Sequence, residues 1–207
     1  MRVRNAVLVV LLLVAGLTSC SDDGSDGDRP SSAPSASAEP LPSGKSDLAL
    51  AAGTYRSPAG FRPALEVEVP TGWTSIHRGA DAFDLGKPDP ARDAPLVAVV
   101  VLRPSQETAD AALAAVEDAL APTATPVQGT LAGEPARGLE VTGGHGQVLA
   151  SADGGIALDA APGQRLRVLA ADVGGDPLLV VVLVPDGDHA DAAMAAAQDL
   201  IDAISPG

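Results

Sequence analysis

Residues 166–184 read Leu-Arg-Val-Leu-Ala-Ala-Asp-Val-Gly-Gly-Asp-Pro-Leu-Leu-Val-Val-Val-Leu-Val. Two aliphatic runs, Leu166–Val173 and Leu178–Val184, flank the turn residues Gly174–Asp176. Runs of this length that are rich in valine and leucine are typical of strands, and a glycine pair between them is typical of a tight turn. The segment therefore predicts an antiparallel β-hairpin at the centre of the fold.

Further strands are expected before this hairpin. Leu65, Val67 and Val69 alternate with glutamates, and this period of two predicts a strand with one solvated face. The valine-rich run Leu96–Leu102 predicts a strand that is covered on both faces. Other strand signals lie at residues 73–76, 82–85, 127–131 and 139–142, with a loop at 87–95 and a weaker hairpin within 148–158.

Two segments show a helical period instead. Residues 107–120 carry an apolar stripe, and Ser105 or Thr108 is the candidate N-cap. A last helix is expected to be capped by Asp188, and its stripe consists of Ala190, Met194, Ala197, Ile201 and Ile204. Sequential strands with hairpin turns and only two alanine-rich helices predict an α+β domain, in which helices cover an antiparallel sheet.

Composition limits the classes of function. The chain has 207 residues, of which 46 % are hydrophobic and 19 % charged, so wholesale disorder is excluded. The formal net charge is −14 and only 2 % of the residues are aromatic. Nucleic-acid binding needs clustered basic residues and aromatic side chains that stack on bases, so no nucleic acid is expected as a partner. Trp73 is expected to be buried and to anchor the first strands.

The N-terminus has the features of an export signal. Two arginines within the first four residues precede an apolar run over residues 6–15, which is shorter than the roughly 20 residues that a membrane-spanning helix needs. The next residues, Leu17-Thr18-Ser19-Cys20, resemble the bacterial lipobox. This resemblance implies cleavage between Ser19 and Cys20 and attachment of lipid to the Cys20 thiol. Because Cys20 is the only cysteine, it has no disulfide partner within the chain.

These signals divide the chain into three parts. Residues 1–19 are expected to be a lipoprotein signal peptide, 20–46 a lipidated tether rich in Ser, Pro and Asp, and 47–205 a single α+β domain. A flexible tether of this length has a reach of about 25–30 Å. The expected location is the outer face of the cytoplasmic membrane, with the membrane as a partner through lipid on Cys20. The alternatives are an ordinary secretory signal with a chance cysteine, or an uncleaved anchor.

Residue types that can carry chemistry are scattered. His77, His145 and His189 lack metal-ligand spacing, so a structural or solvent-exposed role is expected for each. The carboxylate-rich run Asp186–Asp191 has no EF-hand order and fits a turn followed by a helix start, with a weak cation site as the alternative.

Nucleophilic and nucleotide-binding patterns are also weak. Ser75, His77 and Asp81 lie close in sequence, but no Gly-x-Ser-x-Gly turn is present to support a triad. Residues 143–146 read Gly-Gly-His-Gly without a completed dinucleotide signature, so a loop is expected there. No catalytic residue, cofactor or metal is predicted.

Three short motifs carry a family resemblance. Ala52-Gly53-Thr54-Tyr55, Phe61-Arg62-Pro63 and Val69-Pro70-Thr71-Gly72-Trp73 resemble a pattern in exported actinobacterial proteins and, more distantly, the start of LpqN-type lipoproteins. This resemblance implies a PsbP-like fold, in which helices sandwich an antiparallel sheet. It implies no catalytic residues, and members of the family are mostly proposed to bind or assist partners.

The function expected from the sequence is that of a membrane-anchored extracytoplasmic lipoprotein. Its domain is expected to be a non-enzymatic binding or accessory module for a protein or a small apolar ligand of the cell envelope. Two alternatives stay open: an envelope enzyme of hydrolase type whose site forms no visible motif, and a structural spacer. Convergent carboxylates of perturbed pKa in a pocket would favour the enzyme.

Overall fold

The structure, a computed structural model, describes residues 38–42, 48–77, 79–89, 95–120, 124–142, 146–150, 157–160 and 162–207. All of them belong to the compact unit Ala36–Gly207. Residues 1–19 and the first part of the expected tether lie outside the described ranges.

The central hairpin is confirmed. Strands β12 (Gln164–Val173) and β13 (Asp176–Pro185) are antiparallel, and their pairing runs from Val173↔Asp176 to Gln164↔Pro185. The turn consists of Gly174 and Gly175, whose φ angles of 60° and 89° lie in the left-handed region. Glycine adopts this conformation without the steric cost that a Cβ would impose, which explains the glycine pair.

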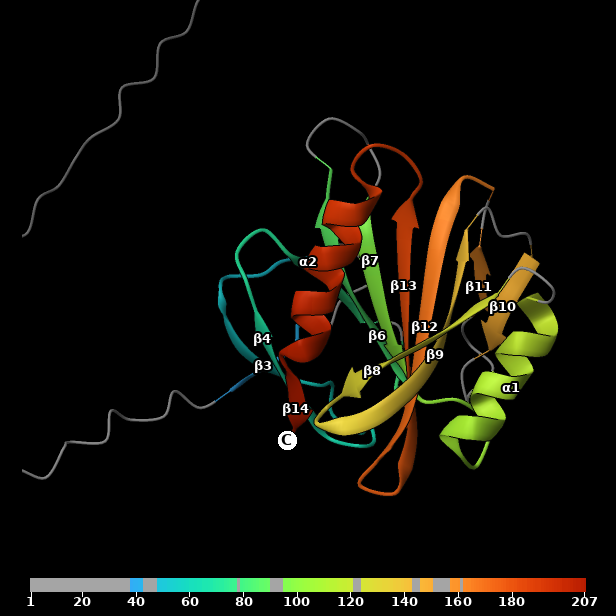
Figure 1. The fold of residues 1–207 in the computed structure, drawn as a ribbon. Helices are drawn as coiled ribbons and strands as arrows, with labels where there is room; N and C mark the ends of the chain where they lie inside the picture. Colours follow the sequence, from blue (N-terminus) through green and yellow to red (C-terminus); the bar gives the residue numbers. More distant parts are fainter. Residues whose placement is uncertain are drawn as a thin grey trace, which may run out of the picture. The chain divides into compact units, whose positions relative to one another are not determined.

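Among the described residues, an eight-stranded antiparallel sheet is built around this hairpin (Figure 1). Its strands, in spatial order, are β2 (Leu48–Ala49), β5 (Thr74–His77), β6 (Ala82–Pro88), β7 (Pro95–Leu102), β13, β12, β9 (Glu134–Thr142) and β8 (Thr125–Leu131). The short strand β2 therefore forms one edge of the sheet and β8 forms the other.

Different elements cover the two faces of this sheet (Figure 1). One face packs against helix α2 (Ala190–Asp202) and a small sheet in the order β1 (Glu39–Pro40), β3 (Gly53–Arg56), β4 (Leu65–Val69) and β14 (Ile204–Pro206). The other face carries helix α1 (Ala109–Leu120) and lies beside the hairpin of β10 (Gly146–Ala150) and β11 (Ala157–Ala160). The predicted α+β class and the sheet covered by two helices are confirmed.

The central strands supply two separate cores because their side chains alternate between the faces. In β7, Val97, Val99 and Val101 pack in the core on the α2 side, whereas Val100 and Leu102 pack in the core on the α1 side. All five side chains are at most 1 % exposed. The predicted strand covered on both faces is therefore confirmed.

The aromatic residues gather in the core on the α2 side. Trp73 is 2 % exposed, which confirms its predicted burial. Phe61 and Phe83 meet edge to face, with ring centroids 5.2 Å apart, and the Tyr55 hydroxyl donates a hydrogen bond to the Ala51 carbonyl oxygen at 3.0 Å. These side chains join the small sheet to the large one.

The helix starts agree only in part with the prediction. Thr108 Oγ1 accepts a hydrogen bond from the Ala111 N–H at 3.2 Å, so Thr108 rather than Ser105 caps α1. The predicted capping of α2 by Asp188 is wrong, because His189 occupies the N-cap position and makes no side-chain capping bond. The chain makes an extra turn at Gly187 (φ 139°), and this moves the helix start one residue further along.

The folded unit begins earlier than residue 47. Strand β1 pairs with β3 in parallel, and the Leu41 N–H donates to the Arg56 carbonyl oxygen at 2.9 Å. Leu41 is 4 % exposed and belongs to the core on the α2 side. Although the stretch expected as tether is mostly small and polar, burial of Leu41 brings residues 38–42 into the fold. At the other end, β14 extends to Pro206 and the Gly207 N–H donates to the Ala64 carbonyl oxygen.

Strand β9 approaches β12 closely at Gly138. A Cβ atom at this position would lie 2.1 Å from the Val168 carbonyl oxygen and 2.7 Å from Leu169 Cδ2. The Leu169 side chain occupies the space above Gly138, and it would also lie 3.8 Å from a Cβ atom placed on Gly129 of β8. The absence of a side chain at Gly138 thus lets the last strands of the sheet pack together.

We predict that Gly138→Ala lowers the free energy of unfolding by about 1–3 kcal/mol, because the added methyl group forces the backbones of β9 and β12 apart. The control is Gly53→Ala, since no atom lies within 4 Å of the place where its Cβ would be. This control is expected to change stability by less than about 0.5 kcal/mol. Urea unfolding followed by circular dichroism measures both, and equal stability of the two variants would contradict the close approach.

Candidate functional site

Three charged side chains meet where β9 and β12 run side by side. Glu140 of β9 lies directly opposite Arg167 of β12. Arg167 donates to Glu140 Oε2 through Nη2 at 2.8 Å and through Nε at 3.1 Å, and Arg165 donates to Oε1 through Nη2 at 2.9 Å. Each side chain is only about one-fifth exposed. Both oxygens of the carboxylate are therefore held by a guanidinium group.

The same arginines reach helix α2. Arg165 also donates to Asp191, and Arg167 Nη1 donates to Gln198 Oε1 at 3.1 Å. Alternate residues of a strand face the same side of the sheet. Arg165 and Arg167 therefore point to the same side as Leu169, which belongs to the core on the α2 side. We call Glu140, Arg165, Arg167, Asp191 and Gln198 the Glu140 cluster. Its formal charges cancel, and it joins one end of the sheet to the helix.

The cluster changes the pKa of two of its members. Burial by itself raises the pKa of the Glu140 carboxyl, but the hydrogen bonds and positive charges of Arg167 and Arg165 outweigh it, so the pKa lies below its usual value. The pKa of Arg165 is raised, first by its hydrogen bond to Asp191 and then by that to Glu140. Both groups are ionised at neutral pH, so the cluster is an ion-pair network.

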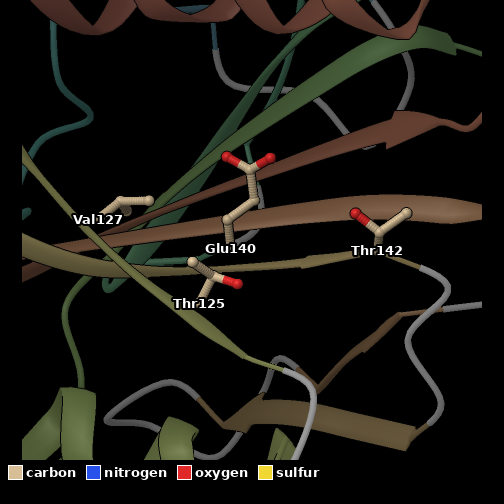
Figure 2. Close-up of a pocket in the computed structure, with 4 residues that line it drawn as sticks. All are labelled: Thr125, Val127, Glu140 and Thr142. Carbon is tan, nitrogen blue, oxygen red and sulfur yellow. The ribbon is translucent and has the colours of Figure 1, made fainter.

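A pocket of about 450 Å³ lies beside the Glu140 cluster. It is lined by Thr125 and Val127 of β8 and by Glu140 and Thr142 of β9. Figure 2 shows Glu140 and Thr142 projecting from β9 on the same side of the sheet, toward helix α2. Because arginines already hold both Glu140 oxygens, the two threonine hydroxyls are the groups best able to bond a polar ligand.

Two further recesses lie elsewhere on the unit. One of about 310 Å³ is formed by α1, β8 and β9 and includes Leu113, Glu117, Gln128 and Arg137. Another of about 600 Å³ lies between the segment 60–64, the β12–β13 turn and residues 206–207. The first of these is on the opposite face of the sheet from the Glu140 cluster, because Leu113 and Leu139 belong to the core on the α1 side.

The two predicted site residues, and three residues for which no site role was expected, lie outside the described ranges. These are Ser19 and Cys20 of the lipobox, His145, and Gly143 and Gly144 of the glycine-rich run. Gly146 begins β10. Within the described part of the chain, no helix has both the length and the apolar character needed to cross a bilayer.

The Ser75, His77 and Asp81 pattern does not assemble into a triad among the described side chains. Ser75 is 1 % exposed, and its hydroxyl has no hydrogen-bond partner among the residues the structure describes. Asp81 faces Arg103 instead, with 3.6 Å between Oδ1 and Nη1. His77 ends β5, and its side chain lies outside the described part.

The Asp186–Asp191 run forms the turn and helix start that its spacing predicts. Asp186 Oδ1 accepts a hydrogen bond from the Gly187 N–H at 3.1 Å, and Asp191 turns toward Arg165. His189 is exposed at the N-cap of α2. Among the described residues, no group of three or more His, Cys, Asp or Glu side chains is placed to hold a metal ion.

The Glu140 cluster is the site that the sequence analysis missed. Arg165 and Arg167 stand two residues apart on a strand whose other side chains on the same face are apolar, and this interruption of the pattern was the available signal. Their partner Glu140 lies 25 and 27 residues earlier in the chain. Only the pairing of β9 with β12 brings the three together.

Comparisons with known proteins give distant structural similarity alone. No protein-family model matches the chain, and no curated protein matches it. The solution structure of cyanobacterial PsbP from Synechocystis is 13 % identical, covers 76 % of this chain and 95 % of its own, and has a TM-score of 0.42. The crystal structure of LpqN, which is involved in cell envelope biogenesis of Mycobacterium tuberculosis, is 13 % identical, covers 77 % and 90 %, and has a TM-score of 0.38. Similarity at this level carries no conclusion about function.

We predict that Glu140→Gln lowers the free energy of unfolding at neutral pH by about 1–3 kcal/mol, since it leaves the partly buried Arg167 without an anion and Arg165 with Asp191 alone. Because folding lowers the pKa of Glu140, its contribution is present above the usual carboxyl pKa of about 4.5 and is lost as the pH falls through the lower folded value. The stability gap between the wild type and the variant should therefore narrow in acid, as measured by urea unfolding at several pH values.

The control for this experiment is Glu66→Gln, which removes the exposed ion pair of Glu66 with Arg56 (3.5 Å). That change should cost less than about 1 kcal/mol. A Glu140 variant that behaves like the Glu66 variant at every pH would show that the Glu140 cluster does not stabilise the fold.

Proposed function

We propose that this protein is a lipid-anchored extracytoplasmic protein and that its folded unit is a non-enzymatic binding module. The anchor is supported by the order of the N-terminal signals: basic residues, a short apolar run, and then Leu17-Thr18-Ser19-Cys20. The described folded unit begins at residue 38, so 17 residues (21–37) separate Cys20 from it. Such a spacing suits a module held near a membrane surface.

The observation that carries the non-enzymatic proposal is the pairing of Glu140. A carboxylate that serves as a general acid or base works best when its pKa lies near the operating pH. Glu140 has the opposite perturbation, because the two arginines lower its pKa and occupy both of its oxygens. The pocket beside it is therefore better suited to holding a ligand or a partner's side chain than to moving a proton.

The partner class that we propose is a protein of the cell envelope, with a small apolar molecule as the second candidate. The recess near the β12–β13 turn supports the second candidate, since Phe61, Pro63 and Val173 are among the residues that line it. A hydrophobic lining with a few polar groups is typical of small-molecule sites.

We predict that Cys20→Ser abolishes incorporation of radiolabelled palmitate, because serine has no thiol to accept the lipid. Ser19→Ala is the matched control, since it keeps a small residue before the cysteine and should leave labelling intact. Radiolabelled lipid that still migrates with the Cys20→Ser protein would contradict the proposed anchor.

The binding role is tested by native mass spectrometry of the protein purified from membranes of its own cells. We expect a stoichiometric complex with a second protein or a small apolar molecule. A purified protein that carries neither would favour a structural spacer. Turnover of an envelope substrate by the purified protein would favour an enzyme instead.

A further inference from the structure

Strand β8 leaves one edge of the large sheet unpaired among the described residues. It ends the strand order next to β9, as Figure 1 shows, and it is seven residues long. The opposite edge is β2, which has only two residues. A long free edge offers a row of backbone donors and acceptors to another extended chain.

The turn after β8 determines which groups face outward. Ala132 (φ 51°) and Gly133 (φ 84°) form a two-residue turn, so Leu131↔Glu134 is the first pair of the hairpin. In such a hairpin this first pair is hydrogen-bonded, and the bonded pairs then alternate along the strands. Residues 131, 129, 127 and 125 therefore bond to β9, and 130, 128 and 126 direct their backbone groups away from it.

These outward groups are available for binding. Gln128 and Thr130 are exposed, and within the described ranges no hydrogen bond engages their backbone N–H or carbonyl groups. Pro126 occupies the third outward position and has no N–H, so it limits how far an added strand can pair. The free edge thus presents two donors and three acceptors.

Recesses flank this edge on both faces of the sheet. On the α2 side lies the pocket with Thr125, Thr142 and the half-buried Val127. On the α1 side lies the recess formed by Leu113, Glu117 and the outward part of β8. Side chains of an added strand would point alternately to the two faces and so into these two recesses.

One carboxylate beside the edge has no ion-pair partner among the described residues, whereas the nearest cation is already paired. The sequence of β8, Thr-Pro-Val-Gln-Gly-Thr-Leu, contains no charged residue. On the α1 side, Arg137 is already paired with Asp110 at 3.0 Å, whereas Glu117 is exposed and forms no ion pair with any described residue. In a chain of net charge −14, Glu117 would attract a basic side chain.

We propose that the free edge of β8 binds an extended, basic segment of a partner protein by strand addition. Backbone hydrogen bonds to Gln128 and Thr130 hold the segment, a basic side chain faces Glu117, and small side chains face Val127 and the two threonines of the pocket on the other side. This inference rests on the proposed binding function and names the surface and the kind of partner that serve it.

The test uses a labelled, acetylated peptide in which lysine alternates with valine, long enough for about five to seven residues to pair. Binding is followed by fluorescence anisotropy with the purified full chain, and the contact is located by amide hydrogen exchange. We expect the amides of Gln128 and Thr130 to become protected. A peptide of the same charge with a central proline should bind more weakly, because proline interrupts the added ladder.

The matched variants are Gln128→Pro and Gln128→Ala. Proline removes the outward N–H, whereas alanine keeps it. Pro126, whose backbone also faces away from β9, shows that β8 accommodates proline at an outward position. Gln128→Pro should bind the peptide at least about fivefold more weakly than Gln128→Ala, as expected for the loss of one backbone hydrogen bond. Glu117→Gln should weaken binding about two- to fivefold.

Several outcomes would overturn the proposal. They are equal binding by the two Gln128 variants, equal binding of the proline-containing peptide, or protection at amides away from β8. If the wild-type protein sediments as a dimer and the Gln128→Pro variant as a monomer, the edge binds a second copy of this chain instead of a partner protein. If the peptide does not bind while native mass spectrometry still finds a bound protein, the inference about β8 is wrong and the proposed function stands.

Discussion

The architecture depends on the burial of β7 and β13 on both of their faces. Residues 97 and 99–102 of β7, and 178–182 and 184 of β13, are each at most 1 % exposed. A sheet whose central strands are apolar on both sides exposes a large hydrophobic area to water unless each face is covered. Helix α1 covers one face, and helix α2 with the small sheet covers the other. Because both helices are rich in alanine, they approach the sheet closely and leave the larger side chains of the strands to fill the cores.

Where β9 and β12 pair at Glu140, Arg165 and Arg167, the sheet changes from apolar to polar on the α2 side, whereas Leu131 and Ala136 keep the other end of β8 and β9 apolar. Arg165, Arg167 and Glu140 replace the aliphatic residues that the central strands place on this face. Their long side chains still cover the sheet, while their charged ends bond to one another and to α2. The cluster therefore covers this part of the sheet and links it to α2 through Asp191 and Gln198. The same cluster forms one wall of the pocket lined by Thr125 and Thr142.

The two edge strands of the large sheet differ in how much backbone they leave open to pairing with another chain. Among the described residues, the edge strand β2 is two residues long, whereas β8 is seven residues long and Pro126 limits its pairing. Natural sheets commonly protect long edges with charged residues or bulges. Strand β8 has no charge, and its flanking recesses differ in chemistry, with threonine hydroxyls on one face and Glu117 on the other. These differences make β8 a more specific surface than an ordinary unprotected edge.

The sequence by itself determined the elements whose signals are local: the β12–β13 hairpin with its glycine turn, the doubly buried β7, both helices and the burial of Trp73. Periodicity and turn residues act within a few positions, so one sequence suffices to identify them. The strand order, the place of Leu41 in the core, the N-cap of α2 and the meeting of Glu140 with Arg165 and Arg167 were decided only by the tertiary structure. Each of these depends on which distant segments pack side by side, and a local sequence pattern does not indicate which segments those are.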